Sequence, residues 1–227
     1  MTRIIGGAVG GRRIQTPRGA ATRPTSDRVR EALFSAIESW CGSLHGLRFL
    51  DLYAGSGAVG LEAWSRGAGV VTLVEQDRRT AALIRDNARA LGFAKANVVT
   101  GSVGTALLRP PSAPYDVAFL DPPYPLSDEA LAEDLAALAD HGWLVPGALV
   151  VVERSSRSPR PRWPAGFEDG RERRYGETTL WYGHAASGPP DGVPDEPSPS
   201  SPSSPSSPSS PSSPSSPSSP SSPSSEE

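Results

Sequence analysis

Residues 49–60 read Phe-Leu-Asp-Leu-Tyr-Ala-Gly-Ser-Gly-Ala-Val-Gly, and this stretch decides the fold. Its apolar start predicts a buried strand near 48–53, and its glycines predict a turn that opens a helix near 58–67. Strand-like and helical patterns then alternate along the chain. Further strands are expected near 70–75, 96–100, 116–120 and 148–153, and further helices near 77–91 and 127–140. This alternation predicts an α/β fold with a parallel, doubly wound sheet.

Additional elements are expected on both sides of this core. A helix is predicted from about Ser26 to Trp40, because its apolar residues recur at spacings of three and four and form one buried stripe. Thr25 or Ser26 is expected to cap it. Residues 173–182 predict two strands joined by a tight turn, which would close the sheet with an antiparallel hairpin. Residues 1–24 predict a small β extension, and we expect it to contribute little to stability.

The glycine-rich turn predicts a cofactor site. The pattern Gly55-x-Gly57-x-x-Gly60 fits a dinucleotide-binding turn, so a nicotinamide oxidoreductase is one reading. Gly55 and Gly57 would let a ligand approach the backbone, and Glu75 could accept hydrogen bonds from the ribose of NAD or of S-adenosylmethionine. Asp51 favours S-adenosylmethionine over NAD, because its carboxylate would repel a pyrophosphate and attract the cationic amino and sulfonium groups of S-adenosylmethionine. Asp51 could also cap the N–H groups of the turn.

A second motif, Asp121-Pro122-Pro123-Tyr124, follows the apolar run 117–120. The carboxyl ends of strands form the edge where open α/β sheets bind ligands. The Asp121 carboxylate and the Pro122 carbonyl could accept hydrogen bonds from a planar exocyclic amine and so free its lone pair for methylation. Tyr124 offers a ring on which a base can stack. The alternative is an ordinary Pro-rich turn in which Tyr124 caps the core.

Together these motifs resemble the class I S-adenosylmethionine-dependent methyltransferases that modify exocyclic amines. Residues 3–7, 11–14 and above all 23–34 (RPTSDRVREALF) are more specific and resemble the RsmD family. The resemblance runs from about Arg3 to about Tyr182. It implies a Rossmann-like fold and methylation of N2 of a guanine in bacterial 16S ribosomal RNA, which would be the partner either alone or within an assembling 30S particle.

The resemblance also implies roles for single residues. Asp121, Pro122 and Tyr124 would be catalytic. The residues expected to bind S-adenosylmethionine are Asp51, Tyr53, Ala54, Gly55, Gly57, Glu75 and Ser102. Two departures from the family stand out. Gly10-Gly11 precedes the arginine pair where the family more often has a basic residue, and Gly101-Ser102 stands where many class I enzymes carry an acid near the adenine.

The amino-terminal thirty residues carry seven arginines against one acid, Asp27. Such a basic arm is the pattern expected of a contact with phosphates. An alternative reading is a solvated basic surface. The arginines expected to bind RNA are Arg3, Arg12, Arg13, Arg23, Arg28 and Arg30.

The rest of the composition limits the remaining choices. Residues 185–227 are expected to be a disordered tail, because they are dominated by Ser-Ser-Pro triplets that bury almost nothing. The methyltransferase domain would then span 25–184. Cys41 is the single cysteine, which excludes an internal disulfide and a cysteine-cluster metal site. The three histidines lack zinc-ligand spacing, so no metal is expected. No apolar run approaches a membrane span, so we expect a cytoplasmic protein that does not bind membranes. We also expect a monomer.

Other functions fit the sequence less well. An adenine-N6 DNA methyltransferase would share Asp121-Pro122-Pro123-Tyr124, but the chain has no room for a separate target-recognition domain. A protein-glutamine methyltransferase usually has Asn where Asp121 stands. A nicotinamide oxidoreductase would leave residues 121–124 without a role, and a non-catalytic RNA-binding relative would not need the complete set of motifs.

Overall fold

The computed structural model describes residues 2–17, 26–93 and 95–186, and its core is one seven-stranded sheet. The predictions on Arg23 and on the Ser-Ser-Pro array lie outside these residues. The strand order is β5-β4-β3-β6-β7-β9-β8. The strands are β3 (Arg48–Leu52), β4 (Val70–Glu75), β5 (Asn97–Thr100), β6 (Tyr115–Leu120), β7 (Leu144–Ser155), β8 (Phe167–Tyr175) and β9 (Thr178–Ala185).

Five of these strands are parallel neighbours, and the last two form the antiparallel hairpin. Leu52 of β3 is in register with Val74 of β4 and with Leu120 of β6, which in turn is in register with Val152 of β7. The central strands therefore reach the same edge of the sheet with their carboxyl ends. The predicted doubly wound sheet with a closing hairpin is confirmed.

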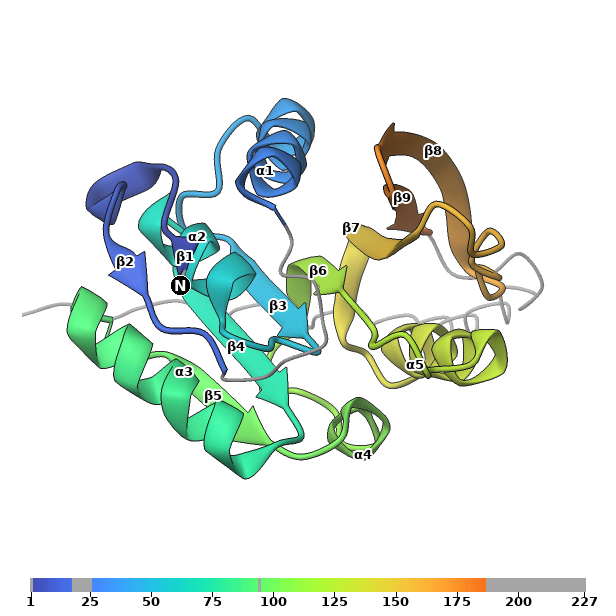
Figure 1. Ribbon diagram of the computed structural model, residues 1–227. Coiled ribbons are helices and arrows are strands. Elements are labelled where there is room, and N and C mark those ends of the chain that lie inside the picture. Colours follow the sequence, from blue (N-terminus) through green and yellow to red (C-terminus); the bar gives the residue numbers. More distant parts are fainter. Residues whose placement is uncertain (1, 18–25, 94, 187–227) are drawn as a thin grey trace, which may run out of the picture. The chain divides into compact units, whose positions relative to one another are not determined.

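Helices cover both faces of the sheet (Figure 1). One face packs against α1 (Asp27–Cys41), α2 (Ala58–Ser65) and α3 (Arg78–Leu91), and the other packs against α4 (Val103–Leu107) and α5 (Asp128–Asp140). Alternate residues of each strand supply the two cores, as the two-residue period of a strand requires. Ser26, the predicted cap, accepts a hydrogen bond from the Val29 amide at the start of α1. The short helix α4 was not predicted.

The amino-terminal segment forms a small sheet of its own. Strands β1 (Thr2–Arg3) and β2 (Arg13–Ile14) pair antiparallel, with the 3-10 helix η1 (Gly7–Val9) between them. Ile4 and Ile14 are buried against apolar residues of α2 and α3. The predicted β extension is therefore present and is packed on two helices.

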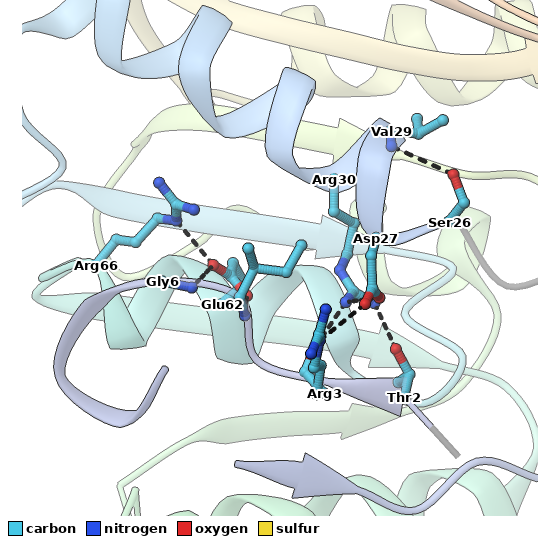
Figure 2. A network of polar contacts seen from close by, with 10 residues as sticks. Thr2, Arg3, Gly6, Ser26, Asp27, Val29, Arg30, Glu62 and Arg66 are labelled. Atoms are coloured by element: carbon cyan, nitrogen blue, oxygen red, sulfur yellow. Dashed lines mark hydrogen bonds and ion pairs between the residues drawn. The ribbon is translucent and has the colours of Figure 1, made fainter. Parts of the chain in front are cut away.

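Buried polar side chains also hold this segment in place. Glu62 of α2 is fully buried and accepts hydrogen bonds from the amides of Ile5 (2.6 Å) and Gly6 (2.8 Å) (Figure 2). A β-carbon at Gly7 would lie 1.9 Å from the carbonyl oxygen of Ser65, so the chain touches the end of α2 directly. Buried hydrogen bonds to a carboxylate are among the stronger ones. These contacts count against the expectation that the extension adds little stability.

A third contact links the same segment to α3. The Asn87 side chain exchanges two hydrogen bonds of 2.9 Å with the backbone of Gln15, one as acceptor and one as donor. Its amide nitrogen also donates to the carbonyl oxygen of Ser56 (3.1 Å), which lies in the glycine-rich turn after β3. One amide therefore bonds to two segments that are far apart in the sequence.

Candidate active site

A cavity of about 850 Å³ opens at the carboxyl edge of the sheet. Residues from the ends of β3, β4, β6 and β7 line it, together with residues of α4 and α5. Its lining includes Asp51, Tyr53, Ala54, Gly55, Glu75, Ser102, Asp121, Pro122, Tyr124, Asp134, Glu153 and Arg154. The structure thus brings both predicted motifs to one cavity.

Asp51 is the most deeply buried acid of this cavity. Only about 1% of the residue is exposed, and its Oδ2 accepts a hydrogen bond from the Gly60 amide (2.8 Å). Burial raises the pKa of Asp51 to about 8, and the nearby charges of Asp121 and Glu75 push in the same direction, while the Gly60 hydrogen bond opposes them. A cation placed beside these three acids would lower that pKa again, so the arrangement suits a positively charged ligand.

Glu75 holds the glycine-rich turn in place. Its Oε2 accepts a hydrogen bond from the Gly55 amide (2.9 Å), and its Oε1 accepts one from the Asp77 amide (2.8 Å). A carboxylate has further lone pairs, so these bonds leave capacity for ribose hydroxyls. Ser102 also lines the cavity and is the N-cap of α4. Its Oγ accepts a hydrogen bond from the Thr105 amide (3.3 Å).

Gly55 and Gly57 both have a φ in the left-handed region that favours glycine (+53° and +78°), but their surroundings differ. Gly55 lines the cavity and has a φ of +53°, which favours glycine, so it fits the prediction of a close backbone approach. Gly57 is buried and is not among the lining residues. A β-carbon there would lie 3.0 Å from Ile84, and one at Gly60 would lie 2.7 Å from Leu73. The missing side chain of Gly57 therefore makes room for core packing, and the close approach of a ligand to its backbone stays a prediction.

Tyr53 links the turn after β3 to α5. Its φ of 62° is unusual for a residue with a side chain, and its hydroxyl donates a very short hydrogen bond to the Asp134 carboxylate. Burial raises the pKa of both groups. Ala54 follows in the cavity lining, and its amide donates to the carbonyl oxygen of Val74 (2.9 Å). In this structure Tyr53 therefore fixes the conformation of the turn by bonding it to α5.

The residues after β6 line the cavity next to the end of β3. Pro122 is buried, whereas Tyr124 is 72% exposed. The amide of Asp121 donates to the carbonyl oxygen of Leu52 (3.4 Å), which keeps this turn beside the end of β3. The reading in which Tyr124 caps the core does not hold, because its ring is available at the cavity mouth.

The predicted RNA-binding arginines separate into two groups. Arg3, Arg12, Arg13 and Arg28 are exposed, although Arg3 forms an ion pair with Asp27 (3.0 Å) and Arg12 donates to the carbonyl oxygen of Ala90 (2.5 Å).

Arg30 differs, because it is fully buried even though it borders the cavity. Its guanidinium bonds to the Thr2 hydroxyl (2.9 Å), the Arg3 carbonyl oxygen (2.6 Å) and Asp27 (2.9 Å) (Figure 2). The prediction that Arg30 offers its charge to RNA is wrong, since it ties the amino-terminal strand to α1.

Sequence reasoning missed two charged residues at the end of β7. Glu153 and Arg154 both line the cavity, and Arg154 forms an ion pair with Asp128 at the start of α5 (2.9 Å). They follow the apolar run 149–152 as Asp121 follows the run 117–120. The same strand-end rule would therefore have identified them.

The described residues contain neither a metal-binding cluster nor a membrane-spanning helix. No group of three or more His, Cys, Asp or Glu side chains in residues 2–17, 26–93 and 95–186 is placed to hold a metal ion. Within the same residues, no helix combines the length and apolar character needed to cross a membrane.

Comparison with known proteins gives consistent matches. The family model described as conserved hypothetical protein 95 matches residues 2–184. Ribosomal RNA small subunit methyltransferase D of Escherichia coli K12 is 37% identical over 180 residues, which cover 77% of this chain and 85% of the relative. A solved structure of a putative methyltransferase from Escherichia coli is 34% identical, with a TM-score of 0.72, and the match covers 82% of this chain and 98% of that one.

A more distant structure shows only the fold. An RNA methyltransferase from Salinibacter ruber, solved in complex with S-adenosyl-L-homocysteine, is 17% identical with a TM-score of 0.56, and the match covers 76% of this chain and all of that one. With the strand order described above, these likenesses identify the sheet as that of the class I methyltransferases.

Proposed function

The chain belongs to the family described as conserved hypothetical protein 95, the RsmD family, and from this we propose that it is an S-adenosylmethionine-dependent ribosomal RNA methyltransferase. The proposed target is the N2 amine of a guanine in bacterial 16S ribosomal RNA. The name of the Escherichia coli relative supports the RNA class. The observation that carries the proposal is that the glycine-rich turn with Asp51 and the turn with Asp121 and Pro122 line one cavity.

The residues of the cavity fit S-adenosylmethionine, which supplies an electrophilic methyl group when it is bound. Asp51 would attract the cationic amino-acid portion, and the backbone at Ala54 and Gly55 would lie against it. Glu75 would accept hydrogen bonds from the ribose hydroxyls, and Ser102 would lie near the adenine. The cluster of acids favours this cation over a pyrophosphate-containing nicotinamide cofactor.

The turn after β6 would act on the amine. Asp121 and the Pro122 carbonyl would accept hydrogen bonds from the N2 hydrogens and hold the nitrogen lone pair toward the methyl carbon. The exposed ring of Tyr124 would stack on the flipped guanine. Asp121 would also accept the proton that the nitrogen loses when it takes the methyl group from the cofactor. Such catalysis would depend mainly on proximity and orientation.

The remaining parts of the proposal concern the surroundings of the enzyme. Arg3, Arg12, Arg13 and Arg28 would contact RNA phosphates, with Arg23 as a further candidate from the undescribed segment. We propose a monomer that acts in the cytoplasm on 16S ribosomal RNA, either naked or within an assembling 30S particle. Its parts would be an extension over 1–24, the methyltransferase domain over 25–184 and a tail over 185–227.

Mass spectrometry of modified nucleosides tests this proposal. RNA and 30S particles from a strain that lacks the gene are incubated in parallel with the purified protein and deuterated S-adenosylmethionine. N2-methylguanosine carrying the label is expected in at least one of the two substrates, and Asp121→Ala should abolish it while retaining cofactor binding in calorimetry. Labelled N6-methyladenosine in place of N2-methylguanosine, or calorimetric binding of NAD without binding of S-adenosylmethionine, would refute the proposal.

A further inference from the structure

The loop that follows β7 carries positive charge to which the proposed function gives no role. Residues 154–162 read Arg-Ser-Ser-Arg-Ser-Pro-Arg-Pro-Arg, with four arginines and no acid, in a chain whose net charge is -3. Arg154 pairs with Asp128 and is 12% exposed, so it serves the fold. The other three, Arg157, Arg160 and Arg162, are exposed. We call residues 155–162 the β7 loop. Such a cluster of exposed arginines is the electrostatic pattern that attracts a polyanion.

The β7 loop borders the cavity. Ser155 and Ser158 line it together with Tyr124, so Arg157 stands in the chain between two lining residues. A base that stacks on Tyr124 stays joined to its RNA strand, and the phosphates that flank it must pass the mouth of the cavity. The arginines of the β7 loop therefore lie within reach of the backbone next to the target nucleotide.

Local contacts hold the β7 loop in one conformation. The Ser156 amide donates to the carbonyl oxygen of Glu177 (2.8 Å), in the turn between β8 and β9. Pro161 is buried, and just beyond the loop Trp163 stacks on Phe167 with 5.5 Å between the ring centroids. A loop that is already ordered loses less conformational entropy when it binds a ligand.

The partners of these arginines leave their charge available. Arg162 forms an ion pair with Glu129 (3.3 Å), but the two side chains are 69% and 66% exposed. An exposed pair of this kind is weak, so a phosphate can replace the carboxylate. The guanidinium of Arg160 lies 6.0 Å from the centre of the Trp181 ring. This contact with an aromatic face orients the side chain and does not neutralise it.

The β7 loop is separate from the basic amino-terminal segment. That segment is bonded to α2 and α3, the helices that follow β3 and β4. The β7 loop follows β7, which neighbours β6 on the side away from β3. In the order of the strands, the turn with Asp121 therefore stands between the two basic surfaces.

We propose that the β7 loop binds the phosphate backbone of the substrate RNA beside the target nucleotide, through Arg157, Arg160 and Arg162. This inference rests on the proposed function and adds to it a second surface that contacts RNA. RNA is favoured over an anionic membrane because the loop adjoins the cavity that would receive the base. The competing account is a merely solvated run of charge.

The salt dependence of RNA binding tests this proposal. Arg157 and Arg162 are replaced together by alanine, and filter binding of transcribed 16S ribosomal RNA is measured over a series of salt concentrations. Each lost phosphate contact lowers the slope of log affinity against log salt by about 0.7–0.9. The slope of the double variant should therefore be shallower by about 1.4–1.8. The KM for RNA in the methylation assay should rise, and calorimetric affinity for S-adenosylmethionine should not change.

Two control variants separate a local contact from a general effect of charge. Arg109→Ala with Arg171→Ala removes the same charge from two exposed arginines that do not line the cavity, and it should keep the wild-type slope. Arg157→Lys with Arg162→Lys keeps the charge and should also keep the slope. If the double alanine variant does not fold, Arg157→Ala alone should lower the slope by about 0.7–0.9.

Three results would overturn the proposal. The first is an unchanged slope in the alanine variants of the β7 loop. The second is an equal fall in the control at Arg109 and Arg171, because the effect would then be one of overall charge. The third is binding of the wild-type protein to phosphatidylglycerol vesicles that the double variant loses while its RNA slope stays unchanged, which would assign the loop to a membrane.

Failure of this inference is distinct from failure of the proposed function, because filter binding needs no catalysis. An enzyme that labels guanine N2 and keeps its slope in the double variant would refute only the role of the β7 loop. A protein that labels no RNA, but whose slope falls in the double variant, would refute only the proposed function. A wild-type protein that does not bind RNA would refute both.

Discussion

Replacing Glu62 by glutamine would measure how strongly the amino-terminal segment is held. The Glu62 carboxylate is fully buried and has three donors around it: the amides of Ile5 and Gly6, and the Nε of Arg66 at 2.8 Å. Glutamine has the same shape but only one acceptor oxygen. Its amide nitrogen would face a backbone N–H, most directly that of Ile5, which lies 2.6 Å from Oε2.

The cost follows from these contacts. One backbone donor loses its acceptor, and each hydrogen bond to a charged group contributes about 1.5–3 kcal/mol. Arg66 also loses a buried opposite charge, and breaking a buried pair costs about 3–5 kcal/mol. Because glutamine keeps part of the network, we expect Glu62→Gln to lower the free energy of unfolding by about 3 kcal/mol. For a domain of this size the corresponding fall in Tm is about 6–12 °C.

Glu38→Gln is the matched control, because Glu38 pairs with the same Arg66 (3.0 Å) but its side chain is 39% exposed. An exposed ion pair contributes about 0–1 kcal/mol. Urea unfolding would measure both variants, and hydrogen exchange of the amides of residues 4–15 would show whether the segment is released in Glu62→Gln. Equal destabilisation by the two variants would refute the reasoning that burial of Glu62 holds the segment.

Three further predictions concern ligands. Because burial keeps the Asp51 carboxyl protonated below a pKa of about 8, binding of a cationic cofactor must release that proton. Calorimetric affinity should therefore rise by up to about tenfold per pH unit as the pH approaches 8, and Asp51→Asn should bind weakly with a flat pH profile. Tyr124→Ala should weaken engagement of the target RNA by about 1–3 kcal/mol in filter binding, whereas Tyr124→Phe, which keeps the ring, should cost little. Replacing Arg12 and Arg13 together by alanine should leave cofactor affinity unchanged and lower the slope of log RNA affinity against log salt by about 0.7–0.9 per lost phosphate contact; an unchanged slope would identify a merely solvated surface.

The sheet could be predicted from the sequence because its strands are strongly apolar and its turns carry glycine. The strand predicted near 70–75 is β4 (Val70–Glu75), and the predicted helices agree with α1, α2, α3 and α5 to within about two residues. The strand predicted near 148–153 extends over Leu144–Ser155, because it pairs with β6 from Leu144 and with β9 as far as Ser155. Helix α4 was missed because five residues are too few to show a helical period.

Residues of the site could be predicted only where a local motif at the end of a single strand identifies them. Asp51 and Asp121 each belong to a local motif and were placed correctly at the cavity. Arg30 was misjudged because its partners Thr2 and Arg3 come from another segment, and no local pattern reveals a contact across 27 or 28 positions. Arg154 was overlooked because its neighbours carry no recognisable motif, although its place after an apolar run was visible in the sequence.

Asn87 has a further consequence for how the molecule works. Its single amide is bonded both to Gln15, in the segment proposed to approach RNA, and to Ser56, in the turn proposed to hold the cofactor. A ligand that holds one of these segments in place would also hold the Asn87 amide to which the other segment is bonded. Such coupling acts equally in both directions. Occupancy at either place would thus be felt at the other through one side chain, without any rearrangement of the sheet.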